Sequence, residues 1–145
     1  MTEASEQDNY DVFVATRKVN TDSEPEWIRL DAPLADARAA LRNLRDAGGN
    51  GLVVPSRYRN PVVSRADART LAAESLRSVR ESVPDRYSDL DDGEDEGACW
   101  IFCAENHTAQ EHGLIPRRRS FRVDKLDGHI WSEPETAAFL VLSSI

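Results

Sequence analysis

The sequence predicts an α+β fold in which two principal helices pack on one face of a mainly antiparallel sheet. Two segments repeat apolar residues at the 3.6-residue period of an amphipathic helix, and both end at glycine or proline. Several short runs alternate apolar and polar residues, as half-buried strands do. Two pairs of these runs are separated by turn residues, which is typical of antiparallel hairpins. Helices and sheet are then expected to share a core.

The chain length and apolar content suit one domain. With 145 residues, of which 40% are hydrophobic, the chain can bury one compact core. Residues 1–9 contain too few apolar side chains to fold, so we expect a disordered tail there. We therefore expect a single domain over residues 10–145, and a subdivision into 10–60 and 61–145 stays open.

The first half begins with a predicted hairpin. Residues 10–19 and 26–31 alternate apolar and polar side chains, and the segment 20–25 between them supplies turn residues. Further along, residues 52–54 form a short apolar run that we interpret as a strand, and the arginine-rich segment 55–61 is expected to be a loop.

A helix is predicted between the hairpin and this third strand. Asp31 is expected to cap its N-terminus, Pro33 suits its first turn, and Gly48 and Gly49 end it. Leu34, Ala37, Leu41 and Leu44 follow the helical period on one face.

The second half opens with another helix and an acidic run. Ser64 begins a helix that continues to Pro84. Between Pro84 and Gly97 seven acidic residues stand against a single arginine, and such a run repels itself and is expected to stay solvated. Residues 98–106 are apolar on both faces, which indicates a strand in the middle of a sheet.

The last part of the chain predicts a second hairpin. Residues 121–123 and 129–131 flank Asp127-Gly128, a turn that matches the native strand twist. Residues 134–145 are compatible with either a short helix or an apolar strand. The predicted order is therefore β-β-α-β-α-β-β-β with an open C-terminal element.

Charge and composition restrict the partners. Asp and Glu number 26 against 18 Lys and Arg, a net charge of −8, which disfavours nucleic acid as a partner. Apolar runs fall short of the roughly 18 residues that cross a bilayer, and the polar N-terminus does not resemble a signal peptide. We expect a cytoplasmic protein without membrane contact, and the sequence leaves its oligomeric state open.

Cysteines and histidines suggest a zinc site at first sight. Cys99, Cys103, His107 and His112 are zinc-ligand types, but finger spacings leave about 12 residues between the two pairs. On one strand the Cys99 and Cys103 α-carbons lie roughly 13 Å apart, too far for a disulfide. We interpret the pair as buried thiols with surface histidines and expect no metal and no cofactor.

The sequence supports a catalytic function less well than a binding function. Cys103 and His129 could meet across strands, but no nucleophile-elbow motif places a thiolate beside a base. Asp124, Asp127 and His129 could form an acid–base group, yet Asp is common beside turns for conformational reasons. The chain also lacks P-loop, dinucleotide-binding and HExxH motifs. We therefore do not expect an enzyme.

Two charged segments are candidates for binding. Arg117–Arg119, with Arg122 nearby, could hold a phosphate or an acidic partner, although pairing with the chain's own residues 89–96 is the simpler interpretation. The acidic segment could itself cover the cationic cleft of a nuclease or another toxin.

Residues 64–135 resemble the YrhB-type immunity-protein family of bacterial toxin systems. The resemblance rests on the helix SRADARTLAAESL, the acidic loop, the strand CWIFCAEN, the segment GLIPRRR and the hairpin FRVDKLDGHIW. Within that family, and in PepSY-like α+β domains, a Val-Asp-Lys is followed by a glycine and an apolar position, here Val123-Asp124-Lys125, Gly128 and Ile130. The resemblance implies stoichiometric inhibition of a cognate toxin, without catalysis or cofactor, and gives these motif residues an architectural role.

The expected function is that of an immunity protein that occludes the active site of a toxin with a basic cleft. The alternatives are a small thiol- or zinc-dependent enzyme and a phage- or stress-related adaptor. The residues expected to bind the partner are six acidic residues and two tyrosines presumed to be exposed: Asp89, Asp91, Asp92, Glu94, Asp95, Glu96, Tyr58 and Tyr87.

Overall fold

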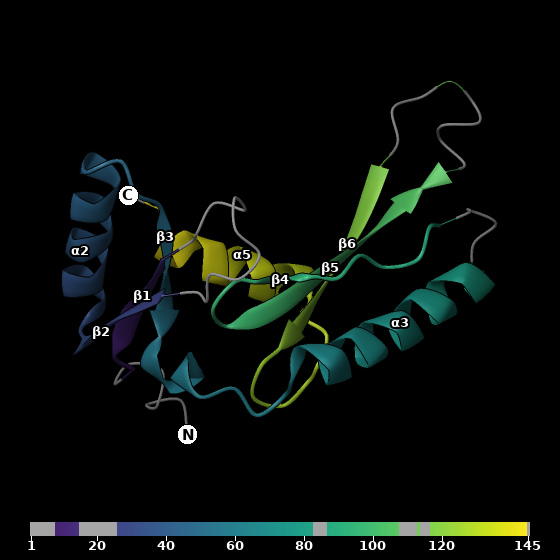
Figure 1. Cartoon of the computed structure of the whole chain (residues 1–145), viewed down its shortest axis with the longest axis horizontal. Coiled ribbons are helices and arrows are strands. Elements are labelled where there is room, and N and C mark those ends of the chain that lie inside the picture. The colour runs from purple at the N-terminus through teal and green to yellow at the C-terminus, as the bar shows by residue number, and fades with distance from the viewer. Residues whose placement is uncertain (1–7, 15–25, 83–86, 108–112, 114–116, 145) are drawn as a thin grey trace. The chain divides into compact units, whose positions relative to one another are not determined.

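The computed structural model describes residues 8–14, 26–82, 87–107, 113 and 117–144. The chain divides into two compact units: unit 1 contains Met1–Asn60, Glu96–Ala98 and Ser132–Ile145, and unit 2 contains Pro61–Asp95 and Cys99–Trp131. Within the described residues each unit has one antiparallel sheet of three strands, with helices beside it (Figure 1). The predicted α+β class is confirmed, but the strands divide between two sheets instead of joining in one.

Unit 1 has the sheet order β2-β1-β3. β1 spans Tyr10–Val14, β2 Glu26–Ala32 and β3 Gly51–Pro55. The central strand β1 aligns Val12 with Ile28 of β2 and with Val53 of β3. Strand β1 is therefore shorter in the described residues than the predicted run 10–19, whose second part lies outside the described residues together with the turn 20–25.

Helices complete unit 1. α2 spans Leu34–Asp46, the 3₁₀ helix η1 spans Ser56–Arg59, and α5 spans Glu133–Leu142. The core consists of buried apolar residues from α2, β1 and β3: Val12, Ala37, Leu41 and Val53. The predicted arginine-rich loop thus contains a helical turn, and the C-terminal segment that the sequence left open is a helix.

Asp31 does not cap α2, so that prediction is wrong. The N-cap of α2 is Pro33, and no side chain among the described residues caps it. Asp31 instead has a left-handed backbone with φ of 47° and donates its N–H to Asp11 Oδ1 at 2.9 Å. Asp31 lies in β2 where the register between β1 and β2 shifts, so the buried Asp11 carboxylate fixes this irregular end of β2.

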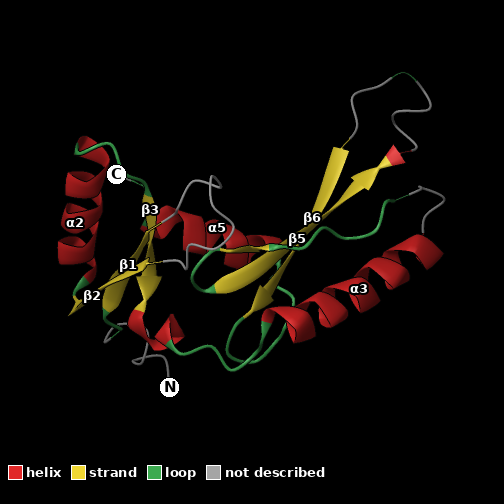
Figure 2. Ribbon diagram, in the orientation of Figure 1, coloured by secondary structure: helices red, strands yellow, loops and turns green. Residues whose placement is uncertain are grey.

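Unit 2 packs one helix on its sheet. α3 spans Arg65–Ser82, and the sheet order is β4-β5-β6, with β4 at Glu94–Asp95, β5 at Cys99–Asn106 and β6 at Arg117–Asp124. As predicted, residues 99–106 form the central strand. Figure 2 shows α3 extending along the same sheet as β5 and β6.

The core of unit 2 joins the helix to one face of the sheet. Small residues on α3 allow close approach to larger side chains of β5 and β6, and the buried set is Ala68, Ala72, Leu76, Leu90, Phe102, Ala104, Phe121 and Val123. Side chains alternate across a strand, so the opposite face of β5 carries Ile101, Cys103 and Glu105. The helix therefore covers a single face of this sheet.

The predicted hairpin over residues 121–131 is only partly correct. β6 pairs along its whole length with β5, from Asn106 opposite Arg117 to Cys99 opposite Asp124. After the turn, the return segment pairs with β6 through one bridge between Val123 and Ile130. The neighbour of β6 in the sheet is therefore β5, because β6 pairs more main-chain groups with β5 than with the return segment.

No helix in the described residues has both the length and the apolar character required to cross a membrane.

Candidate functional site

The acidic segment is an ordered edge of the unit 2 sheet. We define the acidic ledge as residues 87–95, which carry Asp89, Asp91, Asp92, Glu94 and Asp95. Its main chain follows β5: the Ser88 N–H donates to the Glu105 carbonyl at 2.9 Å, and the Asp91 N–H donates to the Cys103 carbonyl at 3.0 Å. β4, at the end of the ledge, continues this antiparallel pairing.

Side chains of the ledge complete the pairing where its backbone departs from a regular strand. Asp91 Oδ1 accepts the N–H groups of Cys103 at 3.0 Å and of Gly93 at 3.1 Å. Ser88 Oγ accepts the N–H of Glu105 at 2.9 Å. Two N–H groups on the side of β5 that faces the ledge therefore have side-chain acceptors.

Arginines of α3 donate hydrogen bonds to main-chain carbonyl groups of the ledge. Arg69 donates from Nε to the Asp91 carbonyl at 3.1 Å and from Nη2 to the Leu90 carbonyl at 2.7 Å. Arg80 Nη2 donates to the Tyr87 carbonyl at 3.0 Å. Leu90 itself is buried in the core between these tethers. The exposed carboxylates agree with the expectation of a solvated run, but a buried leucine and two arginines hold its backbone, which that expectation did not include.

The carboxylates of the ledge differ in exposure. The Asp89 side chain is 94% exposed and lies 3.6 Å from Arg80 Nη2, and Asp91, Asp92 and Glu94 are also exposed. The Asp95 side chain is only 15% exposed and forms an ion pair with Lys125. The exposed side chains of Asp89, Asp92 and Glu94 thus present negative charge on the surface of the ledge.

Of the other predicted binding residues, Tyr58 and Glu96 belong to unit 1, and Tyr87 is the first residue of the ledge. Tyr58 is 7% exposed within η1 of unit 1, so its prediction as an exposed anchor is wrong. Tyr87 is half-buried and packs against the core of unit 2. Glu96 is half-buried and belongs to unit 1. Of the predicted set, the structure brings together only the acidic residues 89–95 and Tyr87.

A buried lysine, Lys125, contacts the last residue of the ledge. Lys125 is 2% exposed, and its ammonium contacts the Asp95 carboxylate and lies 4.5 Å from the centroid of the Trp100 ring. Burial lowers the pKa of Lys125, and the charge of Asp95 opposes that shift. Trp100 is oriented by its Nε1–H, which donates to the Val63 carbonyl at 2.9 Å. No local pattern in the sequence indicates that this lysine is buried.

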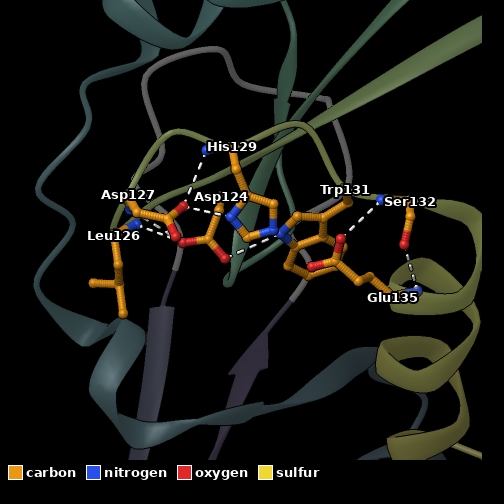
Figure 3. Close-up of polar contacts among 7 residues, drawn as sticks. All are labelled: Asp124, Leu126, Asp127, His129, Trp131, Ser132 and Glu135. Atoms are coloured by element: carbon orange, nitrogen blue, oxygen red, sulfur yellow. Dashed lines mark hydrogen bonds and ion pairs between the residues drawn. The ribbon is translucent and has the colours of Figure 1, made fainter.

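The turn after β6 is organised by Asp124 (Figure 3). Asp124 Oδ1 accepts the N–H groups of Leu126 at 2.8 Å and of Asp127 at 3.3 Å, and Oδ2 accepts the Trp131 indole N–H at 3.0 Å. Asp124 is buried, and its carboxylate closes the loop by bonding both its beginning and its end. This pattern supports the conformational interpretation of Asp124.

Asp127 and His129 form a surface pair in the same turn. Asp127 Oδ1 accepts the His129 backbone N–H at 3.0 Å and lies 2.5 Å from His129 Nδ1. These two hydrogen bonds lower the pKa of Asp127, the backbone bond having the larger effect.

The turn after β6 also brings three metal-ligand residue types together. In the described ranges, Asp124, Asp127 and His129 are the group whose ligand atoms all lie within 4.8 Å of one another. Because both Asp124 oxygens already accept hydrogen bonds, the turn accounts for this arrangement without an ion. Cys99 and Cys103 lie on β5 with no such grouping among the described residues, and His112 lies outside them.

The contacts of Cys103 do not favour a thiol nucleophile. Its Sγ lies 3.4 Å from Ser120 Oγ, and the register of β5 and β6 places it opposite Ser120. His129 Nδ1, by contrast, is engaged with Asp127. A pairing of Cys103 with His129, which the sequence left as the less favoured alternative, is not among the contacts that the structure describes.

The arginine segment and the acidic ledge occupy opposite edges of one sheet. β4 flanks β5 on one side and β6 flanks it on the other, so the two edges are about two strand spacings, roughly 10 Å, apart. Within the described residues no ion pair joins Arg118 or Arg119 to the ledge. The prediction that these arginines neutralise residues 89–96 is wrong for Arg118 and Arg119.

Comparison with family models, with curated proteins and with solved structures gave no match to this chain.

Proposed function

We propose that the protein acts without catalysis, as an immunity protein that binds a cognate bacterial toxin and occludes its active site. The partner is expected to be a protein with a basic cleft. The single observation that supports this function best is the acidic ledge, where an ordered backbone displays the carboxylates of Asp89, Asp92 and Glu94.

Order in the ledge matters because binding a flexible loop costs conformational entropy. Here Arg69, Arg80 and Leu90 already hold the backbone, so less ordering remains to be done on association. A fixed row of carboxylates also attracts a basic surface from a distance and raises the association rate. Both effects suit a protein that must capture a toxin before the toxin acts.

The resemblance to YrhB-type immunity proteins is consistent with this division of roles. The motif positions have structural contacts: Val123 is in the core, Asp124 closes the turn, and Lys125 forms the buried ion pair. Gly128 has φ of +77°, a conformation that favours glycine. Partner recognition would then fall to residues outside the motif, and the ledge offers them.

The test begins with the toxin candidate, the product of the gene next to this one. Its expression should arrest bacterial growth, and co-expression of this protein should restore growth. The purified pair is then compared with the variant Asp89→Asn/Asp92→Asn/Glu94→Gln by stopped-flow association at several salt concentrations. We expect the variant to associate roughly tenfold more slowly at low salt and to show a weaker salt dependence.

A control variant removes the same charge elsewhere. Asp36→Asn/Asp46→Asn/Glu74→Gln changes three exposed residues on α2 and α3 and should leave the association rate nearly unchanged. If both variants slow association equally, net charge is responsible and the ledge has no special role. If co-expression fails to restore growth, the immunity function itself is wrong for that partner.

A further inference from the structure

Among the described residues, the outer edge of β6 is unpaired over the first part of the strand. Peptide groups in an antiparallel strand alternate between the two sides. The Asp124 N–H donates to His129, and the Arg122 carbonyl accepts from Trp131, so the even-numbered residues face away from β5. By the same alternation the N–H and C=O groups of Arg118 and Ser120 also face outward.

These outward groups have no strand beside them in the described part of the chain. β6 pairs with β5 on its inner side, and the return segment pairs with its outer side only at Arg122–Asp124. Residues 118–121 therefore present main-chain donors and acceptors in the pattern that another extended segment can pair with.

The positive charge of the arginines on β6 favours some pairing segments over others. Arg118 and Arg119 are both exposed, and strand alternation places them on opposite faces of the sheet. The Arg119 guanidinium lies 5.7 Å from the centroid of the Phe121 ring, two residues further along the same strand. Pairing of β6 with β6 of a second copy would place arginines beside arginines, which is unfavourable. The same arginines favour an acidic strand.

We propose that β6 is a docking edge for an extended, acidic peptide segment of a partner protein, which adds as a fourth strand beside Arg118–Phe121. Main-chain hydrogen bonds to Arg118 and Ser120 supply pairing, and acidic side chains next to Arg118 and Arg119 supply selectivity. A nucleic acid fits less well, because its phosphates accept hydrogen bonds but do not donate to the outward carbonyls. This edge is separate from the acidic ledge, so it does not depend on the function proposed above.

The test uses the full chain and a short capped peptide of alternating glutamate and valine. Binding is measured by fluorescence anisotropy, with the same peptide carrying lysine in place of glutamate as the control. Amide hydrogen exchange of the wild-type protein gives a second readout. We expect the glutamate peptide to bind, the lysine peptide not to bind, and exchange at Arg118 and Ser120 to slow when the glutamate peptide is added.

Ser120→Pro separates strand pairing from charge attraction. It removes an outward N–H that has no role in the β5 ladder, so proline is tolerated there. Ser120→Ala, which keeps the N–H, is the matched control. We expect Ser120→Pro to weaken peptide binding roughly tenfold or more and Ser120→Ala to change it less than about twofold. Arg118→Glu/Arg119→Glu should reverse the preference toward the lysine peptide.

Several outcomes would overturn the proposal. One is that the glutamate peptide does not bind, or that it binds without slowing exchange at Arg118 and Ser120. Another is that a thymidine oligonucleotide binds more tightly than the peptide, which would make the edge a phosphate site. A third is that size-exclusion chromatography shows self-association that Arg118→Glu/Arg119→Glu abolishes, which would make a second copy the occupant.

Discussion

The ammonium of Lys125 lies 4.5 Å from the centroid of the Trp100 ring while it contacts the carboxylate of Asp95. Three segments of unit 2, namely β4, β5 and the turn after β6, therefore meet at one buried charge. Such a pair is costly to desolvate, and its contribution depends on both partners being present. The aromatic face adds a favourable contact with the cation.

Removal of Asp95 should destabilise unit 2 more than removal of Lys125. Asp95→Ala leaves a buried ammonium without its partner, and we expect a loss of about 3–5 kcal/mol in the free energy of unfolding. Lys125→Met leaves a carboxylate that solvent can partly reach, so we expect a loss of only about 1–2 kcal/mol. Urea denaturation followed by tryptophan fluorescence measures both. Equal losses would show that the buried charge is not what makes the pair sensitive.

Asp11 should make unit 1 sensitive to acid. Burial by itself raises the pKa of Asp11, but hydrogen bonds from Arg59, the Asp31 N–H and Ser56 outweigh burial and hold the pKa below 3.8. A lowered folded-state pKa gives stability that is complete above 3.8 and is lost as the pH falls through the folded value.

The comparison is between the wild type and Asp11→Asn. The variant should be less stable at neutral pH, and the difference between the two should shrink as the pH falls below 3.8. Urea denaturation of both proteins at a series of pH values measures this difference. A difference that stays constant with pH would contradict the assignment of Asp11 as the titrating group.

The elements that could be predicted from sequence were those with strong local signals. The apolar run of β5 on both faces predicted its central position, and Gly48-Gly49 and Pro84 placed helix ends close to where α2 and the described part of α3 stop. In each case the decisive interactions lie within one segment, so the local pattern was sufficient.

The acidic ledge and the buried ion pair depend on contacts between distant segments. Lys125 is buried because Asp95, thirty residues earlier in the chain, meets it beside Trp100, and no local pattern reveals such a partner. The ledge is ordered because Arg69 and Arg80 reach it from α3. The charge of the acidic run predicted that its side chains are solvated, but no local pattern predicted these tertiary contacts to its backbone.

Gly93 should be one of the least tolerant positions of the ledge. Its φ is +84°, and a Cβ there would lie 2.4 Å from Phe102 Cε1 in the core. Gly113, also in unit 2, has φ of +76°, and among the described residues no atom lies within 4 Å of where its Cβ would be. Gly113→Ala should therefore cost only the backbone strain, about 1–2 kcal/mol.

Gly93→Ala adds a steric clash to that strain. We expect it to cost about 1–3 kcal/mol more than Gly113→Ala, because Phe102 is packed within the core and must shift. Thermal unfolding of the two variants under identical conditions gives the comparison. Similar destabilisation by both substitutions would mean that Phe102 accommodates the added methyl group.

Asp91 and Asp92 offer a test of whether order in the ledge matters separately from its charge. Both are exposed aspartates, but only Asp91 accepts the N–H groups of Gly93 and Cys103 in the contacts described here. Asp91→Ala and Asp92→Ala remove the same charge from neighbouring positions. Only the first should release the Cys103 N–H, and its amide exchange should rise roughly fivefold, as expected for a bond worth about 1 kcal/mol.

The same two variants also test whether order in the ledge contributes to partner binding. If preorganisation contributes to association, Asp91→Ala should slow association with the toxin candidate more than Asp92→Ala does, and the difference should persist at high salt, where charge effects are screened. A difference that disappears at high salt would assign the effect to charge alone. Unchanged Cys103 exchange in Asp91→Ala would instead show that the ledge keeps its order without this carboxylate.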